Sequence, residues 1–232
     1  MANVASSQAW RRRLTLPTYK IAEAARYARL PRGTLAAWHK EGKSRTLSAR
    51  QDRASLSYMQ LIEAAVVAAF RDKGVSLNKI RKARAYVAEK LTSNYPFAEY
   101  RFKTNGSGLF MDYEEIEGPH RHGTLLRADQ DGQLAWSEII GRLEEFEYEY
   151  HDIVTKWHVA GRDSEVVIDP RMCFGAPVIA GTPTWVLKGR HDAGESIEDI
   201  AEEFELDRRQ VIEGLAFEGI EIKAGVAANW TH

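Results

Sequence analysis

The sequence predicts an α+β protein with a mainly helical N-terminal domain, a small central antiparallel β region and a helical C-terminal module. Over residues 19–91, apolar residues recur at three- and four-residue spacing, the period of an amphipathic helix. Between residues 94 and 164, aromatic and apolar residues flank Gly-containing turn dipeptides or alternate with polar ones, as in β-hairpins. Near the C-terminus, two short apolar stripes each follow a helix start signal. We therefore divide the chain as follows: flexible arm 1–17, helical domain 18–93, β-rich region 94–164, helical module 165–221 and tail 222–232.

Charge is distributed unevenly along the chain. The first 90 residues hold 19 Lys and Arg against 6 Asp and Glu, a net charge of +13, whereas the remaining residues hold 13 against 27, a net charge of −14. Such asymmetry favours a front half that binds nucleic acid and an acidic rear half. Two solvated faces of a single fold are the alternative.

The first two helices are predicted around a proline. Ile21, Ala24, Ala25 and Ala28 share one helical face, and Pro31 stops that helix because the residue before a proline is pushed out of the α region. A second helix is expected from Arg32 to Lys40, with Leu35 and Trp38 facing inward and Gly42 as its C-cap. Two short helices joined by a tight turn form a helix-turn-helix; an αα-hairpin that merely packs is the alternative.

In a helix-turn-helix, the N-terminal residues of the second helix enter the major groove, and basic residues around it hold the phosphates. The basic flank of this helix therefore favours DNA binding over simple packing. The residues expected to contact DNA are Arg32, Thr34, His39, Lys40, Lys43 and Arg45.

Two longer helices follow a polar connection. The first is amphipathic from Tyr58 to Phe70 and ends before Gly74. The second starts after Ser76 and runs from Leu77 to Leu91. Either helix is a candidate for a homodimer interface, and both are equally candidates for the monomer core.

The run from Tyr19 to Leu91 resembles the DNA-binding domain of the MerR family. TLAAW at 34–38 matches the Thr-Leu and aromatic of the family's recognition helix, and RDKGVSLNKIRKA at 71–83 matches the segment between its last two helices. The resemblance implies a mainly helical, winged helix-turn-helix domain. Ala36 and Ala37 stand where the family usually has Arg and an aromatic, and the wing after Gly42 is not typical. The family's characteristic promoter therefore does not follow from the resemblance.

The central region contains signals for short strands. Asn105-Gly106 and Asp131-Gly132 predict hairpin turns, a short helix is expected over 137–143, and two strands are expected over 146–151 and 153–159. His120 and His122 lie two residues apart, but no third metal ligand stands at a diagnostic spacing. Cys173, the only cysteine, has no identifiable base partner. We therefore expect no catalytic site, no metal site and no cofactor.

The C-terminal module opens with a segment punctuated by Gly and Pro. Two helices follow it, with N-cap signals at Ser196 and Asp207. The segment from Val166 to Gly219 resembles the domain-of-unknown-function family numbered four-three-three, and the matching residues are Asp169-Pro170, Gly175, Pro177, Gly181-Thr182, Gly194, Ser196 and Glu198. Pro183-Thr184-Trp185 stands where that family often has Arg and a hydrophobic residue.

The order of these parts, from Tyr19 to Gly219, resembles the larger VapB-type antitoxins. The resemblance implies a cytoplasmic, non-enzymatic homodimer that binds operator DNA, represses its own operon and neutralises a PIN-domain (VapC-type) ribonuclease toxin. The active site of that toxin class is acidic, so basic and aromatic residues of the module are the candidates for toxin contact: Arg171, Trp185, Lys188, Arg190 and Arg208.

Two other functions remain open. One is a stand-alone MerR-like transcription regulator whose rear half senses a ligand or a protein. The other is an enzyme that acts on nucleic acid. The chain has no apolar run of the roughly 20 residues that a membrane helix needs, and no secretory signal follows Arg11–Arg13, so we expect a cytoplasmic protein without a membrane partner.

Overall fold

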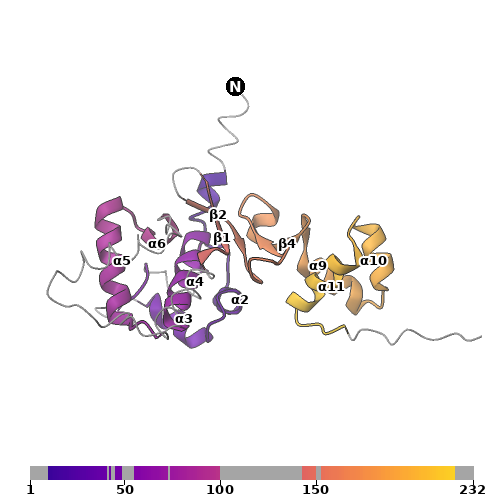
Figure 1. Ribbon diagram of the computed structural model, residues 1–232, viewed down its shortest axis with the longest axis horizontal. Helices are drawn as coiled ribbons and strands as arrows, with labels where there is room; N and C mark the ends of the chain where they lie inside the picture. Colours follow the sequence, from indigo (N-terminus) through magenta and orange to yellow (C-terminus); the bar gives the residue numbers. More distant parts are fainter. Residues whose placement is uncertain are drawn as a thin grey trace, which may run out of the picture.

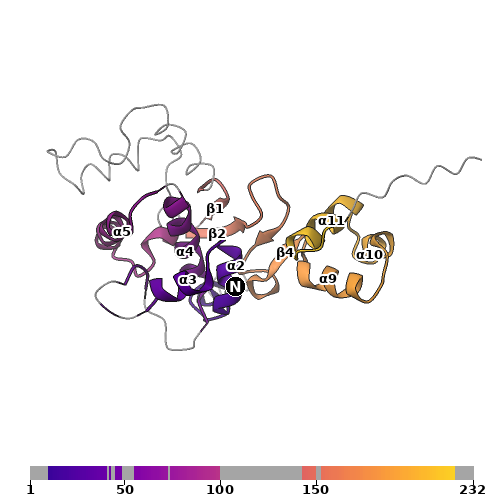
Figure 2. The same cartoon turned by 90° about the horizontal axis from the view of Figure 1, so that it is seen from below.

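The structure is a computed structural model of the 232-residue chain. It describes residues 10–40, 42, 45–48, 55–72, 74–99, 143–149 and 153–222. The helices α9 (Thr184–Asp192), α10 (Ile197–Glu203) and α11 (Arg208–Phe217) gather at one end of the molecule. Helix α5 (Leu77–Leu91) lies at the opposite end, and a small sheet lies between them (Figures 1 and 2). The prediction of an α+β fold with a small antiparallel sheet is confirmed.

The two expected N-terminal helices are present as α2 (Ile21–Tyr27) and α3 (Arg32–Trp38). Between them, Arg29 adopts a left-handed conformation with φ of 55° and makes the turn. Helix α3 ends two residues before the predicted Lys40, and its C-cap is His39 rather than Gly42. The Trp38 carbonyl accepts hydrogen bonds from the backbone N–H groups of the returning chain at residues 46 and 47 instead of continuing the helix.

Helix α4 (Tyr58–Asp72) is the centre of the N-terminal half. Every residue from 58 to 70 is buried, although the sequence predicted only one apolar face. Two of its buried polar side chains are satisfied internally, because Gln60 exchanges hydrogen bonds with Ser57, and Glu63 receives two from Arg84 of α5 at 3.0 Å. The short helix α6 (Pro96–Glu99) also packs on α4, so α4 is enclosed on all sides.

The sheet is an antiparallel meander of five strands in chain order. The strands are β1 (Phe146–Glu149), β2 (Ile153–His158), β3 (Val167–Ile168), β4 (Pro177–Ile179) and β5 (Thr182–Pro183). The first two were predicted, but the last three were not. Since the sheet runs across residue 164, the expected boundary between the β-rich region and the C-terminal module falls inside one hydrogen-bonded unit.

The C-terminal module contains three helices rather than the two predicted. The predicted helices are α10 and α11, and their N-caps form as expected. The Ser196 hydroxyl accepts the Asp199 N–H at 3.1 Å, and Asp207 forms a reciprocal capping box with Gln210. The unpredicted helix is α9, which starts directly after β5 at Pro183.

The N-terminal segment is ordered against the core as far as the structure describes it. Residues 10–13 form a helical turn, and Leu14 is only 4% exposed. Its carbonyl accepts the Met59 N–H at the start of α4. We expected an arm up to residue 17, but burial of Leu14 ties this end of the segment to the domain.

Several expectations lie outside the described residues: the turns at 105–106 and 131–132, His120, His122, Lys43, the tail beyond residue 222 and most of the helix at 137–143. Within the described ranges, no group of three or more His, Cys, Asp or Glu side chains is arranged to hold a metal ion. No helix among the described residues has the length and apolar character to cross a membrane.

Candidate functional site

The candidate DNA surface lies at the start of α3 and along the chain that returns from its end. Arg32 is the first residue of α3 and is exposed, and Thr34 is partly exposed one turn in. Lys40 and Arg45 are exposed beyond the C-terminal end of the helix. These four side chains are therefore accessible to a nucleic acid.

His39 is placed differently from our expectation. Its side chain is fully buried, and Nδ1 lies 2.8 Å from the Ser48 carbonyl oxygen. A buried imidazole cannot reach a phosphate, so the assignment of His39 to DNA binding was wrong. Its role is to close the loop after α3 onto the helix.

Arg81 is a residue of this surface that sequence reasoning missed. From α5, its Nε donates to the Thr46 hydroxyl at 3.2 Å, next to the exposed Arg45. Thr46 is 3% exposed and also donates its backbone N–H to the Trp38 carbonyl. Arg81 thus links α5 to the segment that carries Arg45. Sequence reasoning missed Arg81 because its partner Thr46 lies 35 positions away.

Three of the basic candidates for toxin contact already have carboxylate partners on the module's surface. Lys188 pairs with Asp192 at 2.7 Å, and Arg208 pairs with Glu198 at 3.0 Å. Arg190 binds both Glu195 and Glu203. Exposed ion pairs of this kind contribute little stability and exchange readily for another partner. The fourth surface candidate, Trp185, is 62% exposed on the first turn of α9.

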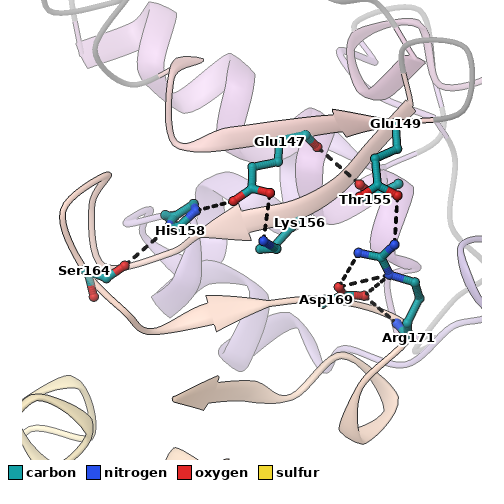
Figure 3. A network of polar contacts seen from close by, with 8 residues as sticks. All are labelled: Glu147, Glu149, Thr155, Lys156, His158, Ser164, Asp169 and Arg171. Atoms are coloured by element: carbon teal, nitrogen blue, oxygen red, sulfur yellow. Dashed lines mark hydrogen bonds and ion pairs between the residues drawn. The ribbon is translucent and has the colours of Figure 1, made fainter. Parts of the chain in front are cut away.

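Arg171 belongs to the fold rather than to this surface. Its guanidinium binds both carboxylate oxygens of Asp169 and one oxygen of Glu149 in β1 (Figure 3). It also lies over the Trp10 ring, 5.9 Å from the ring centre. The hydrogen bonds with Asp169 raise the pKa of Arg171 against the opposing effect of burial. Because Arg171 joins the N-terminal segment, β1 and the end of β3, we withdraw it as a toxin contact.

A second polar cluster on the sheet has the composition of a catalytic triad but not its geometry. His158 Nε2 lies 2.7 Å from Glu147, while Nδ1 faces the backbone carbonyl of Ser164, 3.0 Å away (Figure 3). The Ser164 hydroxyl instead donates to Glu213 of α11 at 2.5 Å. A nucleophile needs its hydroxyl against the histidine, so this cluster fastens the sheet to α11.

The Glu147 carboxylate is held in its ionised form by this cluster. Burial alone would raise its pKa, but hydrogen bonds from Lys156 and His158 outweigh that effect and lower the pKa. Glu147 is therefore a satisfied carboxylate of the fold rather than a candidate general acid or base.

The N-terminal helix pair α2–α3 and the C-terminal module meet at a junction between α2 and α11, which we define by Arg26, Tyr27, Phe217 and Glu218. The Arg26 guanidinium binds the Glu218 carboxylate at 2.9 and 3.4 Å and lies 5.1 Å from the centres of both aromatic rings. The rings stack with centres 6.1 Å apart. Thr184, at the start of α9, donates to the same carboxylate.

Electrostatics at this junction favour the ionised pair. Burial alone would lower the pKa of Arg26, but the hydrogen bond to Glu218 raises it overall. A second link lies close by, since Tyr19 stacks edge-on against Tyr27 and donates its hydroxyl to the Gly175 carbonyl at 3.0 Å. Helix α2 is therefore fixed to the C-terminal module at two places. Sequence reasoning missed both, because the partners are more than 150 residues apart.

Comparisons with known proteins were made for the whole chain. The family described as a protein of unknown function (DUF433) matches residues 166–217. A curated relative, the putative antitoxin VapB45 of Mycobacterium tuberculosis, is 25% identical over 235 residues, which cover 91% of this chain and 98% of the relative. The X-ray crystal structure of Rv2018 from Mycobacterium tuberculosis superposes with a TM-score of 0.68 at 23% identity, covering 88% of this chain and 99% of that one.

The DUF433 match begins at β3 and ends with α11, and the crystal structure shows that the fold as a whole is shared with a known protein. The chain thus carries a DUF433 module at residues 166–217 and resembles a VapB-type antitoxin along nearly its whole length.

Proposed function

We propose that this chain is the antitoxin of a type II toxin-antitoxin pair. In this proposal it neutralises a PIN-domain (VapC-type) ribonuclease and, as a homodimer, represses its own operon by binding operator DNA through a MerR-like winged helix-turn-helix. The observation that carries the proposal is the similarity to a putative VapB antitoxin over 91% of the chain.

The exposed basic side chains around α3 support the DNA-binding half of the proposal. Arg32 and Thr34 lie at the N-terminal end of the helix, where a recognition helix meets base edges. Lys40 and Arg45 lie beyond its other end, and Lys43 is assigned with them by sequence alone. Each cation that neutralises a phosphate releases counterions, so these residues set the salt dependence of binding.

The C-terminal module supports the toxin-binding half. Trp185 offers an exposed aromatic anchor, a residue type enriched among the energetic centres of interfaces. Lys188, Arg190 and Arg208 surround the module with cations whose present partners are exposed carboxylates. Carboxylates of a toxin can replace these partners at small cost.

The toxin half is tested with the product of the gene adjacent to this chain's own. Co-expression should yield a stable complex, and the chain should inhibit the ribonuclease activity of the purified partner at near-stoichiometric concentration. Trp185→Ser should weaken inhibition by about tenfold or more. A neighbour without a PIN domain, or one that the chain does not inhibit, would favour the stand-alone regulator instead.

The DNA half is tested with the fragment upstream of the chain's own coding sequence. Replacing Arg32 and Lys40 together by Ala should lower affinity through the lost base and phosphate contacts, and should reduce the salt slope by about 1, because one phosphate contact is lost. The control variant replaces Arg162 and Arg209 by Ala, which removes the same charge from the C-terminal half. Equal effects of the two variants would show that net charge, rather than the α3 surface, drives binding. Light scattering on the free chain tests the proposed homodimer.

A further inference from the structure

A small pocket opens where the N-terminal segment meets the DUF433 module. Arg13, Leu16 and Tyr19 line it from the first segment, Tyr58 from the start of α4, and Pro170 and Phe174 from the module. Tyr19 fixes the two sides together, because its hydroxyl binds the Gly175 carbonyl at 3.0 Å. The pocket is therefore built by the packing of both halves of the chain.

The rim of this pocket exposes large apolar side chains. Phe174 is 75% exposed and Leu16 is 54% exposed, and among the described residues only Trp185 is a comparable exposed large hydrophobic. Two of these three side chains thus converge on one small opening. Such convergence is typical of a surface that a partner covers.

The backbone that presents Phe174 is strained. Cys173 and Phe174 have φ of 44° and 55°, in the left-handed region that bulky residues rarely adopt. Gly175 follows with φ of 78°, and a Cβ there would lie 2.1 Å from the Tyr19 hydroxyl oxygen. A glycine at position 174 would remove the strain, yet the chain places an exposed phenylalanine there. Backbone strain that is retained at an exposed aromatic residue indicates that the ring of Phe174 has a function.

The wall of the pocket carries a hydroxyl without a partner. Tyr58 is 1% exposed, and its Oη has no hydrogen-bond partner within the part of the chain that the structure describes. Burial raises the pKa of Tyr58, so the group is a donor at physiological pH. A buried donor left unsatisfied is costly, but this oxygen has no exposed surface, so a group bound in the pocket does not reach it without rearrangement.

Size and charge define the occupant. The cavity volume is about 40 Å³, and a single water needs roughly 10–15 Å³ on this measure, so the pocket admits one short branched side chain. The Arg13 guanidinium lies over the Phe174 ring, 5.4 Å from its centre, and Arg12 beside it is exposed. The lining contains no carboxylate, so the rim is positively charged.

We propose that this pocket anchors a segment of a partner protein that inserts one branched aliphatic side chain between Leu16 and Phe174 and places a neighbouring carboxylate at Arg13. The identification of this partner as the toxin rests on the proposed function. The kind of segment that the pocket binds is argued from the pocket alone and is independent of that function.

The test uses the full chain and two short peptides, with binding followed by amide resonances in NMR. The probe is acetyl-Gly-Glu-Leu-Glu-Gly-amide, and its counterpart carries Lys in place of both Glu. The probe should shift resonances of Leu16 and Phe174 and bind at least about fivefold more tightly than the lysine peptide. No shift at these residues, or equal binding of the two peptides, overturns the proposal.

Phe174→Gly separates a binding role from a structural one. The variant removes the ring and the backbone strain, so the probe's affinity should fall by about tenfold while the melting temperature is unchanged or higher. Thr92→Gly is the matched control, because Thr92 also has a left-handed backbone, with φ of 51°, but lies after α5 and outside the pocket. Its affinity should equal that of the wild type. The proposal is overturned if the Phe174→Gly protein has a lower melting temperature than the wild type but binds the probe equally well. The ring would then stabilise the fold and not bind the partner.

The same variants are then titrated with the toxin from the adjacent gene. Loss of affinity for Phe174→Gly but not for Thr92→Gly places the pocket in the toxin interface. If both variants bind the toxin with equal affinity, the pocket is not part of the toxin interface, and the proposed function is unaffected. If the wild type binds no such protein, the proposed function fails, and the peptide titration alone decides whether the pocket binds this class of segment.

Discussion

The junction between α2 and α11 allows a quantitative prediction for Arg26→Ala. The Arg26 side chain is 45% exposed, so solvent screens its ion pair with Glu218, and we assign that pair about 0.5–1 kcal/mol. The two cation–π contacts add about 0.5–1 kcal/mol each. The expected loss is therefore about 2 kcal/mol, which lowers the melting temperature by roughly 4–8 °C for a chain of this size.

A double-mutant cycle isolates the ion pair from the ring contacts. Arg26→Ala, Glu218→Ala and the double variant are unfolded in urea, and the coupling energy should be about 0.5–1 kcal/mol. The cycle between Arg208 and Glu198 is the matched control, since that pair has similar geometry but both side chains are mostly exposed, and we expect no measurable coupling there. Equal coupling in the two cycles would refute the argument that partial burial and the flanking rings make the junction strong.

Two further predictions concern packing and buried charge. Gly214→Ala should destabilise the module by about 1–2 kcal/mol, because the new Cβ would lie 2.7 Å from Leu187 Cδ1. A Cβ at position 189 would meet no atom within 4 Å, so Gly189→Ala should instead stabilise α9 by up to about 1 kcal/mol. Calorimetry checks both variants, and a change of stability in the same direction for both would contradict this reasoning. Burial raises the pKa of Glu63 despite Arg84, so the protonated form is favoured in the folded state. Its contribution to stability is full below the ordinary pKa near 4.5 and is lost as pH rises through the raised value. Urea unfolding measured from pH 4 to pH 7 should therefore show the wild type losing stability relative to Glu63→Gln as the pH rises. A difference in unfolding free energy between the two proteins that does not change with pH would disprove this prediction.

The helices that the sequence predicted are those with local signals. The periodic apolar residues of α2, α4 and α5 and the caps at Ser196 and Asp207 act within a few residues of each other, so they can be read from the chain alone. Helix α9 was missed because its N-cap is Pro183, which makes no side-chain cap, and because Gly189 interrupts its interior. The strands β3, β4 and β5 have two or three residues each, too short to show alternation.

The candidate site residues were harder to predict, because their roles depend on distant partners. The sequence grouped His39 with the basic residues around it, but burial against Ser48 assigns it to the fold. Arg171 was chosen for its charge, yet Glu149, which it binds, lies 22 positions away on another strand. Phe174 was not chosen at all, since an apolar residue in a Gly/Pro-rich segment is ordinarily buried. Only the structure shows that the ring is exposed.

The charge asymmetry suggested two halves with separate tasks, but the contacts between them argue for coupled tasks. Arg26 and Tyr27 belong to α2, the first helix of the proposed helix-turn-helix, and also contact α11 of the DUF433 module. Tyr19, just before that helix, lines the pocket and donates its hydroxyl to the carbonyl of Gly175, the residue after Phe174. A partner that presses on Phe174 therefore acts on the segment that leads directly into α2, and α2 packs on the proposed recognition helix α3. The proposed pocket and the proposed DNA surface are therefore joined by a continuous series of packed side chains through Tyr19. A coupling between the two sites would be reciprocal, so operator DNA would change the affinity of the pocket by the same factor by which pocket occupancy changes the affinity for DNA.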